Sequence, residues 1–194
     1  MSDFWLYLKL GLHHVLDWHA YDHILFLITL TVGYTFDNWK KILMLVTLFT
    51  LGHTVSLFLA TYDVVSVNAK IVEFLIPITI LVAAIFNVFT AGKTEKNSKS
   101  TVIYITTVFF GLIHGLGFSS YFNVISSNLS SKILPLLEFA LGIEIAQLVV
   151  VLIVLIITSV IQMVFRFSKR DWILVISSIV IGMVIPMILA NKIW

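Results

Sequence analysis

Histidines and acidic residues stand inside apolar stretches of this chain, where ionisable side chains are costly and usually functional. Four of the six histidines and two aspartates fall between residues 13 and 23. On a helix, His19, Asp22 and His23 would have the spacing i, i+3, i+4 and would share one face. Two imidazoles and a carboxylate at that spacing suit a divalent transition-metal ion. The chain has no cysteine, which excludes thiolate ligands and disulfides.

Later apolar stretches carry further candidates. The candidate metal ligands are His14, His19, Asp22, His23, His53, His114 and Glu144. The residues expected to support them are Glu73, Glu138 and Gln147. Counted from the same side of the membrane, the ionisable side chains within the apolar stretches lie between the surface and about 17 Å depth, at a rise of about 1.5 Å per residue. We therefore expect a pocket that opens to one side of the membrane.

The elements that must position these residues are membrane helices. Hydrophobic residues make up 60% of the chain and charged residues 11%, and the mean hydropathy is +1.07. A soluble domain carries about 25% charged residues, so this composition excludes a soluble or disordered protein. We predict an all-α bundle that forms one integral membrane domain over residues 1–194. The six predicted transmembrane helices are 20–36, 42–62, 71–91, 101–122, 133–165 and 172–191, each near the length of about 20 residues that a span needs.

Residues 4–18 precede the first predicted span and are apolar but short. They carry Lys9, His13, His14 and Asp17, which is too polar a set for a span of that length. We predict an interfacial or re-entrant helix at this position.

The distribution of basic residues predicts the orientation of the bundle. The loops after the first, third and fifth predicted spans carry eight Lys and Arg residues, and the opposite side carries four. The basic loops are therefore expected in the cytoplasm of a bacterial inner membrane, with the C-terminus facing outward. A net charge of +2 is too small to suggest nucleic acid as a partner. The expected partners are a metal ion and the lipid bilayer, and a homo-oligomer is left open.

Five segments of the chain, in order, resemble the HupE/UreJ family of small membrane proteins. They are residues 11–27, 49–54 (FTLGHT), 72–76 (VEFLI), 110–118 (FGLIHGLGF) and 139–147 (FALGIEIAQ). Each segment alone is a weak signal, but five in one order make the resemblance specific. The resemblance implies a nickel permease or a metal accessory protein of the kind found beside hydrogenase and urease genes.

Three functions fit these residues. The first is a permease or metal-delivery protein for a nickel-type divalent cation, with nickel or zinc as the ion; its affinity should fall below about pH 6, because ligand imidazoles must be neutral. It would need alternating access, because the half with the basic loops has no buried carboxylate or histidine. The second is a zinc-type hydrolase of a lipid or lipid-linked substrate, with Asp22, Glu144 and Ser56 as candidate catalytic residues. The third is an assembly protein whose polar residues join helices.

Overall fold

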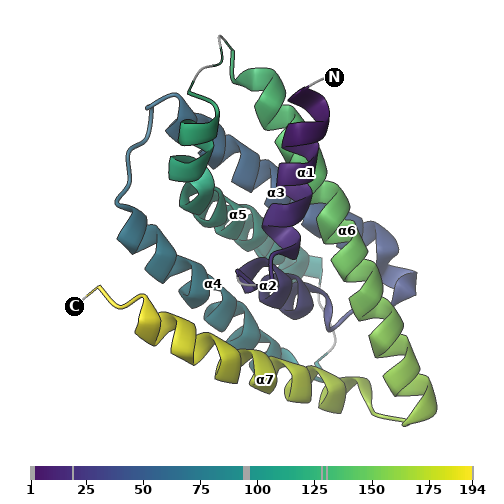
Figure 1. Ribbon diagram of the computed structural model, residues 1–194. Helices are drawn as coiled ribbons and strands as arrows, with labels where there is room; N and C mark the ends of the chain where they lie inside the picture. The colour runs from purple at the N-terminus through teal and green to yellow at the C-terminus, as the bar shows by residue number, and fades with distance from the viewer. Residues whose placement is uncertain (1–2, 19, 94–96, 128, 130, 194) are drawn as a thin grey trace.

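All regular elements among the described residues are helices, as the composition predicted (Figure 1). The computed structural model describes residues 3–18, 20–93, 97–127, 129 and 131–193. The helices are α1 (Asp3–Leu16), α2 (Asp22–Thr31), the short 3₁₀ turn η1 (Phe36–Asn38), α3 (Trp39–Thr61), α4 (Ala69–Thr90), α5 (Asn97–Ile125), α6 (Ile133–Val164) and α7 (Lys169–Ala190). The helices α3 to α7 are long and apolar enough to cross a membrane. The chain is thus an all-α integral membrane protein.

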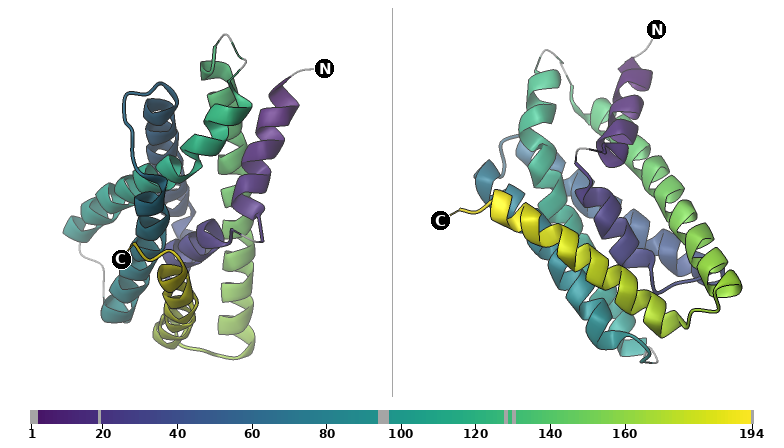
Figure 2. Two further views of the ribbon diagram at one scale, coloured as in Figure 1. Left: turned by 60° about the vertical axis from the view of Figure 1, so that its left-hand side comes forward. Right: turned by 60° about the horizontal axis from the view of Figure 1, so that its bottom comes forward.

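The first predicted span differs from the structure. A helix was expected over 20–36, but α2 ends at Thr31 and has only 10 residues. It follows α1, which has 14 residues, and neither helix is long enough to cross a bilayer alone. Together they run from one end of the bundle toward the other (Figures 1 and 2). The prediction of one helix over 20–36 was wrong because the chain forms two short helices here, α1 and α2, joined by a polar turn.

The helix α1 occupies Asp3–Leu16, where an interfacial or re-entrant helix was predicted. It packs lengthwise against α6, and its side chains Tyr7, Leu8 and Val15 are buried. An added Cβ at Gly11 would collide with the backbone oxygen of Phe139 and lie 3.1 Å from the Cα of Gly142. Backbone contact of this kind is how small residues let membrane helices approach closely.

A second glycine contact joins α3 to α5. A Cβ at Gly52 would meet the backbone of Val108, and one at Gly111 would meet the backbone of Phe49. A Cβ at Gly115 would meet the backbone oxygen of His53. The two helix pairs, α1 with α6 and α3 with α5, are therefore fixed at close range. Histidines lie next to these glycines: His14 follows Gly11 on α1, and His53 and His114 lie beside Gly52 and Gly115 on α3 and α5.

The two ends of the bundle differ in charge. The start of α1, the loop 62–68, the end of α5 and the start of α6 lie at one end, which we call the α1 end (Figure 1). The loops 32–38, 91–93 and 165–168 lie at the other, which we call the basic end. The basic end carries Lys40, Lys41, Lys93, Arg166, Lys169 and Arg170. Large apolar side chains such as Leu148 and Leu152 are exposed along α6, as expected of a lipid-facing surface.

Candidate metal centre

Three histidines from three helices meet at the centre of the bundle. His14 comes from the last turn of α1, His23 from the first turn of α2 and His53 from the middle of α3. One ring nitrogen of each lies within 4.8 Å of the others. Metal–nitrogen bonds of about 2.0–2.1 Å allow about 4.2 Å at most between two nitrogens on one ion. A small inward movement of the widest pair would therefore let all three hold a single ion.

A fourth histidine stands beside these three. The ring centroid of His114, on α5, is 5.2 Å from that of His23. The Nδ1 atom of His114 lies 2.8 Å from the backbone oxygen of Phe110. That contact uses Nδ1 as the donor and leaves the Nε2 lone pair free. We call His14, His23, His53 and His114 the histidine cluster.

The histidine cluster has more nitrogen atoms than hydrogen-bond partners. Among the described residues, His14, His23 and His114 each have a buried Nε2 without a partner, and both ring nitrogens of His53 are unpartnered. His53 and His114 are almost completely buried. A buried polar atom normally has a partner, because leaving it unsatisfied costs roughly 1–3 kcal/mol. A metal ion takes one nitrogen from each ring, so an ion in the cluster would satisfy up to four of these five atoms.

Asp22 orients one member of the cluster. Its Oδ1 accepts from the backbone N–H of His23 at 2.8 Å and lies 3.1 Å from the Nδ1 atom of the same residue. A carboxylate on Nδ1 fixes the tautomer that presents Nε2 to a metal. The sequence grouped Asp22 with the ligands, and in the structure its Oδ1 contacts the Nδ1 atom of His23.

Aromatic rings enclose the cluster. The ring centroid of Phe118 is 4.2 Å from that of His14, and Phe49 and Phe139 lie 5.1 Å from His114 and 5.6 Å from His14. Apolar walls of this kind lower the local dielectric and strengthen electrostatic interactions inside. These phenylalanines were not singled out from the sequence. The spacing of Phe49 and His53 on one face of a helix was the available signal.

Glu144 does not join the histidine cluster. Its carboxylate accepts hydrogen bonds from Thr47, at 2.7 Å to Oε1, and from Thr50, at Oε2. Gln147 lies in the same group, with its Oε1 3.1 Å from the Thr50 hydroxyl. The sequence did not single out the two threonines, although Thr47, Thr50 and His53 follow one another at intervals of three residues.

The other candidate residues have separate positions. His19 lies outside the described residues. Glu138 is buried on α6 with an unpartnered Oε2, and Glu73 is exposed in the first turns of α4. Ser56 donates to the backbone oxygen of His53 and lies against Gly115.

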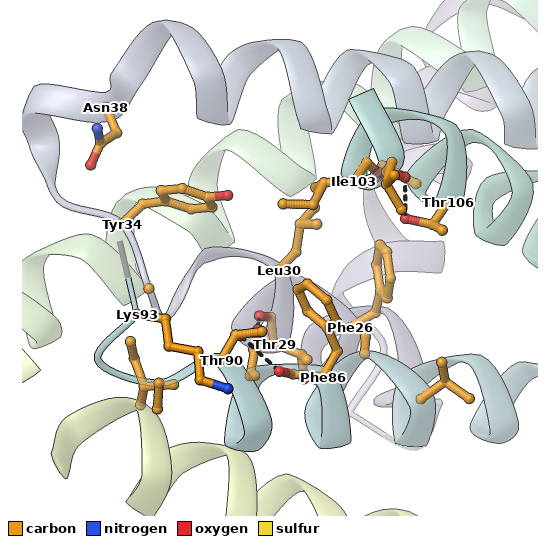
Figure 3. Close-up of a pocket in the computed structure, with 18 of the residues that line it drawn as sticks. Phe26, Thr29, Leu30, Tyr34, Asn38, Phe86, Thr90, Lys93, Ile103 and Thr106 are labelled. Carbon is orange, nitrogen blue, oxygen red and sulfur yellow. Dashed lines mark hydrogen bonds between the residues drawn. The ribbon is translucent and has the colours of Figure 1, made fainter. Parts of the chain in front are cut away.

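Two cavities approach the cluster from different sides. A cavity of about 590 Å³ beside the last turns of α1 and the turn that follows it is lined by His14, Asp17 and Tyr121, among others. A cavity of about 540 Å³ at the basic end runs from Lys93 and Arg170 inward to Phe26 and Phe110 (Figure 3). Phe26 stacks on Phe49 at 4.6 Å and lies 5.5 Å from His114, so its ring stands between this second cavity and the cluster.

Replacing Asp22 with asparagine should weaken metal binding by about 10–100-fold without abolishing it, because an amide holds the His23 ring less firmly and lacks the charge. Competition with a chromophoric chelator would measure the affinity. Asp37→Asn, at an exposed carboxylate of the basic end, is the matched control. Equal affinities for the two variants would show that Asp22 does not act through His23.

The fold and the site define a class: an integral membrane protein with a buried cluster of imidazoles between its helices. The model of the HupE / UreJ protein family matches residues 1–192. The chain therefore belongs to the HupE/UreJ family, which confirms the resemblance found in five of its segments. No curated protein and no solved structure matches the chain.

Proposed function

We propose that this protein is a membrane permease or delivery protein for a nickel-type divalent metal ion, which the histidine cluster binds as its cargo. The observation that carries the proposal is the set of five buried ring nitrogens without partners. Membership of the HupE/UreJ family supports a role in nickel or metal handling. Imidazole ligands suit nickel, zinc and cobalt, and the donor set alone does not choose among them.

The two cavities support a path for the metal ion that is closed only between the histidine cluster and the cavity at the basic end. Metal would arrive through the cavity beside the last turns of α1, which reaches His14. It would leave through the cavity at the basic end once Phe26 and Phe49 separate. The basic loops favour the cytoplasm for the second cavity, so the path would run inward. His19, next to the polar turn, remains a candidate ligand for arriving metal.

The test is metal uptake into proteoliposomes. Purified protein reconstituted in lipid vesicles should import radioactive nickel into vesicles that contain a chelator, and protein-free vesicles should not. Zinc and cobalt added as competitors would rank the ions. Uptake equal to that of protein-free vesicles, with metal bound to the protein, would contradict a permease.

A zinc-type hydrolase remains the second candidate, because three imidazoles with an adjacent carboxylate also suit a catalytic site. Asp22 is the carboxylate in contact with the cluster and would be the base. Glu144 is held by threonines and Ser56 by its own helix, so each would have to move to take part. Bound metal that does not exchange, together with release of fatty acid from vesicle lipids, would favour this function over transport.

Replacing Phe26 with leucine should open the closed segment of the path, because a shorter side chain no longer covers Phe49 and His114. We expect efflux of preloaded nickel from vesicles to rise several-fold while metal binding in detergent stays unchanged. Phe89→Leu, at an exposed position of α4, is the control. An efflux rate equal to that of the wild type would remove Phe26 from the gate.

A further inference from the structure

A second polar group lies next to the histidine cluster and has a different chemistry. It consists of Thr47 and Thr50 on α3 with Glu144 and Gln147 on α6, and we call it the oxygen cluster. Thr50 and His53 are three residues apart, so the two groups are neighbours along α3. Thr50 and Gln147 are buried, and Gln147 is fully inaccessible.

The Thr50 hydroxyl lies within hydrogen-bond distance of several oxygen atoms. The single Thr50 hydroxyl hydrogen faces three oxygen atoms: Oε2 of Glu144, Oε1 of Gln147 at 3.1 Å and the backbone oxygen of Val46 at 3.2 Å. A hydroxyl donates one hydrogen bond, so two of these oxygens receive nothing from it. Meanwhile the Nε2 atom of Gln147 is buried without a partner.

The charge of the oxygen cluster is also unbalanced. Among the described residues, no Lys, Arg or His forms an ion pair with Glu144, whose recorded partners are the two threonine hydroxyls. A carboxylate between two membrane helices normally has a partner of opposite charge. This imbalance is the same whichever way the Gln147 amide is turned.

We propose that the oxygen cluster is a binding site for a sodium ion. Carboxylate, hydroxyl and carbonyl oxygens are the ligands of hard cations, whereas the neighbouring imidazoles suit transition metals. Sodium has nearly the radius of Ca²⁺, whose oxygen ligands lie at about 2.3–2.6 Å. The threonine and carboxylate oxygens, which now lie at hydrogen-bond distance, would move apart to about 3.4 Å to hold it. One carboxylate balances one positive charge, which favours a monovalent ion.

The sodium site would join α3 to α6 one turn from His53. Binding would hold the part of α3 that carries His53 against the helix that also supports α1, and thereby link sodium to the geometry of the histidine cluster. The site itself does not depend on the permease proposal, because it is formed by residues outside the histidine cluster.

The test is performed on the full chain in detergent without any transition metal. Thermal unfolding is followed in sodium chloride, potassium chloride and choline chloride at equal ionic strength. At about ten times its dissociation constant, sodium should raise the Tm of the wild type by about 3–6 °C relative to the other salts. Equal Tm values in the three salts would overturn the proposal. A rise on acidification without a sodium effect would also overturn it, because a proton would then satisfy the carboxylate.

Variants of the oxygen cluster test whether the sodium-dependent rise in Tm comes from this site. Thr47→Val keeps the size of the side chain and removes an oxygen ligand, and Glu144→Gln removes the charge; both should lose most of the sodium-dependent rise. Thr106→Val, at an exposed position of α5, should keep it. If the oxygen-cluster variants do not fold, direct binding of radioactive sodium to the wild type decides the matter. Saturable binding that potassium does not displace supports the site, and no binding overturns it.

Discussion

Protein in which His53 is replaced by alanine should purify without stoichiometric nickel under loading conditions that saturate the wild type. His53 belongs to the closest group of three, with its ring centroid 5.6 Å from that of His14 and 5.9 Å from that of His23. It is also the histidine with both ring nitrogens unpartnered. Removing it leaves two of the three grouped ligands, and one missing ligand usually costs a transition-metal site most of its affinity. Elemental analysis of the purified protein measures the result.

Two further histidine variants serve as comparisons for the metal content of His53→Ala. His13→Ala removes the neighbouring exposed histidine and should leave metal content unchanged. His114→Ala should give an intermediate loss, because its ring contacts His23 without belonging to the closest group of three. Full metal content in His53→Ala would mean that the cluster is not the binding site, and the unpartnered nitrogens would then be interhelical contacts of the assembly-protein kind.

Much of the fold could be predicted from the sequence because a helix that crosses a lipid bilayer needs about 20 mostly apolar residues. The five long helices α3 to α7 follow directly from runs of apolar residues. The half-helices α1 and α2 could not be predicted from apolar runs in this way, because each carries histidines and is shorter than a span. Their placement depends on contacts with other helices, above all with α6, and hydropathy contains no information about such contacts.

The candidate site could be predicted as a set of residue types but not as an arrangement. His14, His23 and His53 were named from their unusual positions in apolar stretches, and the structure brings them together. Glu144 was named for the same reason, yet it pairs with Thr47 and Thr50. Depth in the membrane was similar for all of them. The direction that each side chain faces is set by helix rotation, which the sequence does not give without a partner helix.

The glycine contacts set the rotation of the helices and the distance between them, so a larger side chain at such a contact should displace a histidine. Replacing Gly142 with leucine should abolish stoichiometric metal binding although it changes no ligand. A Cβ at this position would collide with the backbone oxygen of Leu8 and lie 3.0 Å from the backbone nitrogen of Leu12. Backbone atoms cannot rotate away as a side chain can, so α1 must move off α6. His14 is in the last turn of α1 and would leave the cluster with it.

Gly182→Leu is the matched control for this substitution. Gly182 lies within α7, and a Cβ there would meet no atom within 4 Å. The added leucine should therefore leave both metal content and Tm close to those of the wild type. In Gly142→Leu, overpacking should cost about 1–3 kcal/mol, which lowers the Tm by several degrees without unfolding the bundle. Folded Gly142→Leu protein with full metal content would show that α1 does not supply a ligand, and the ion would then have to be held by His23, His53 and His114 alone.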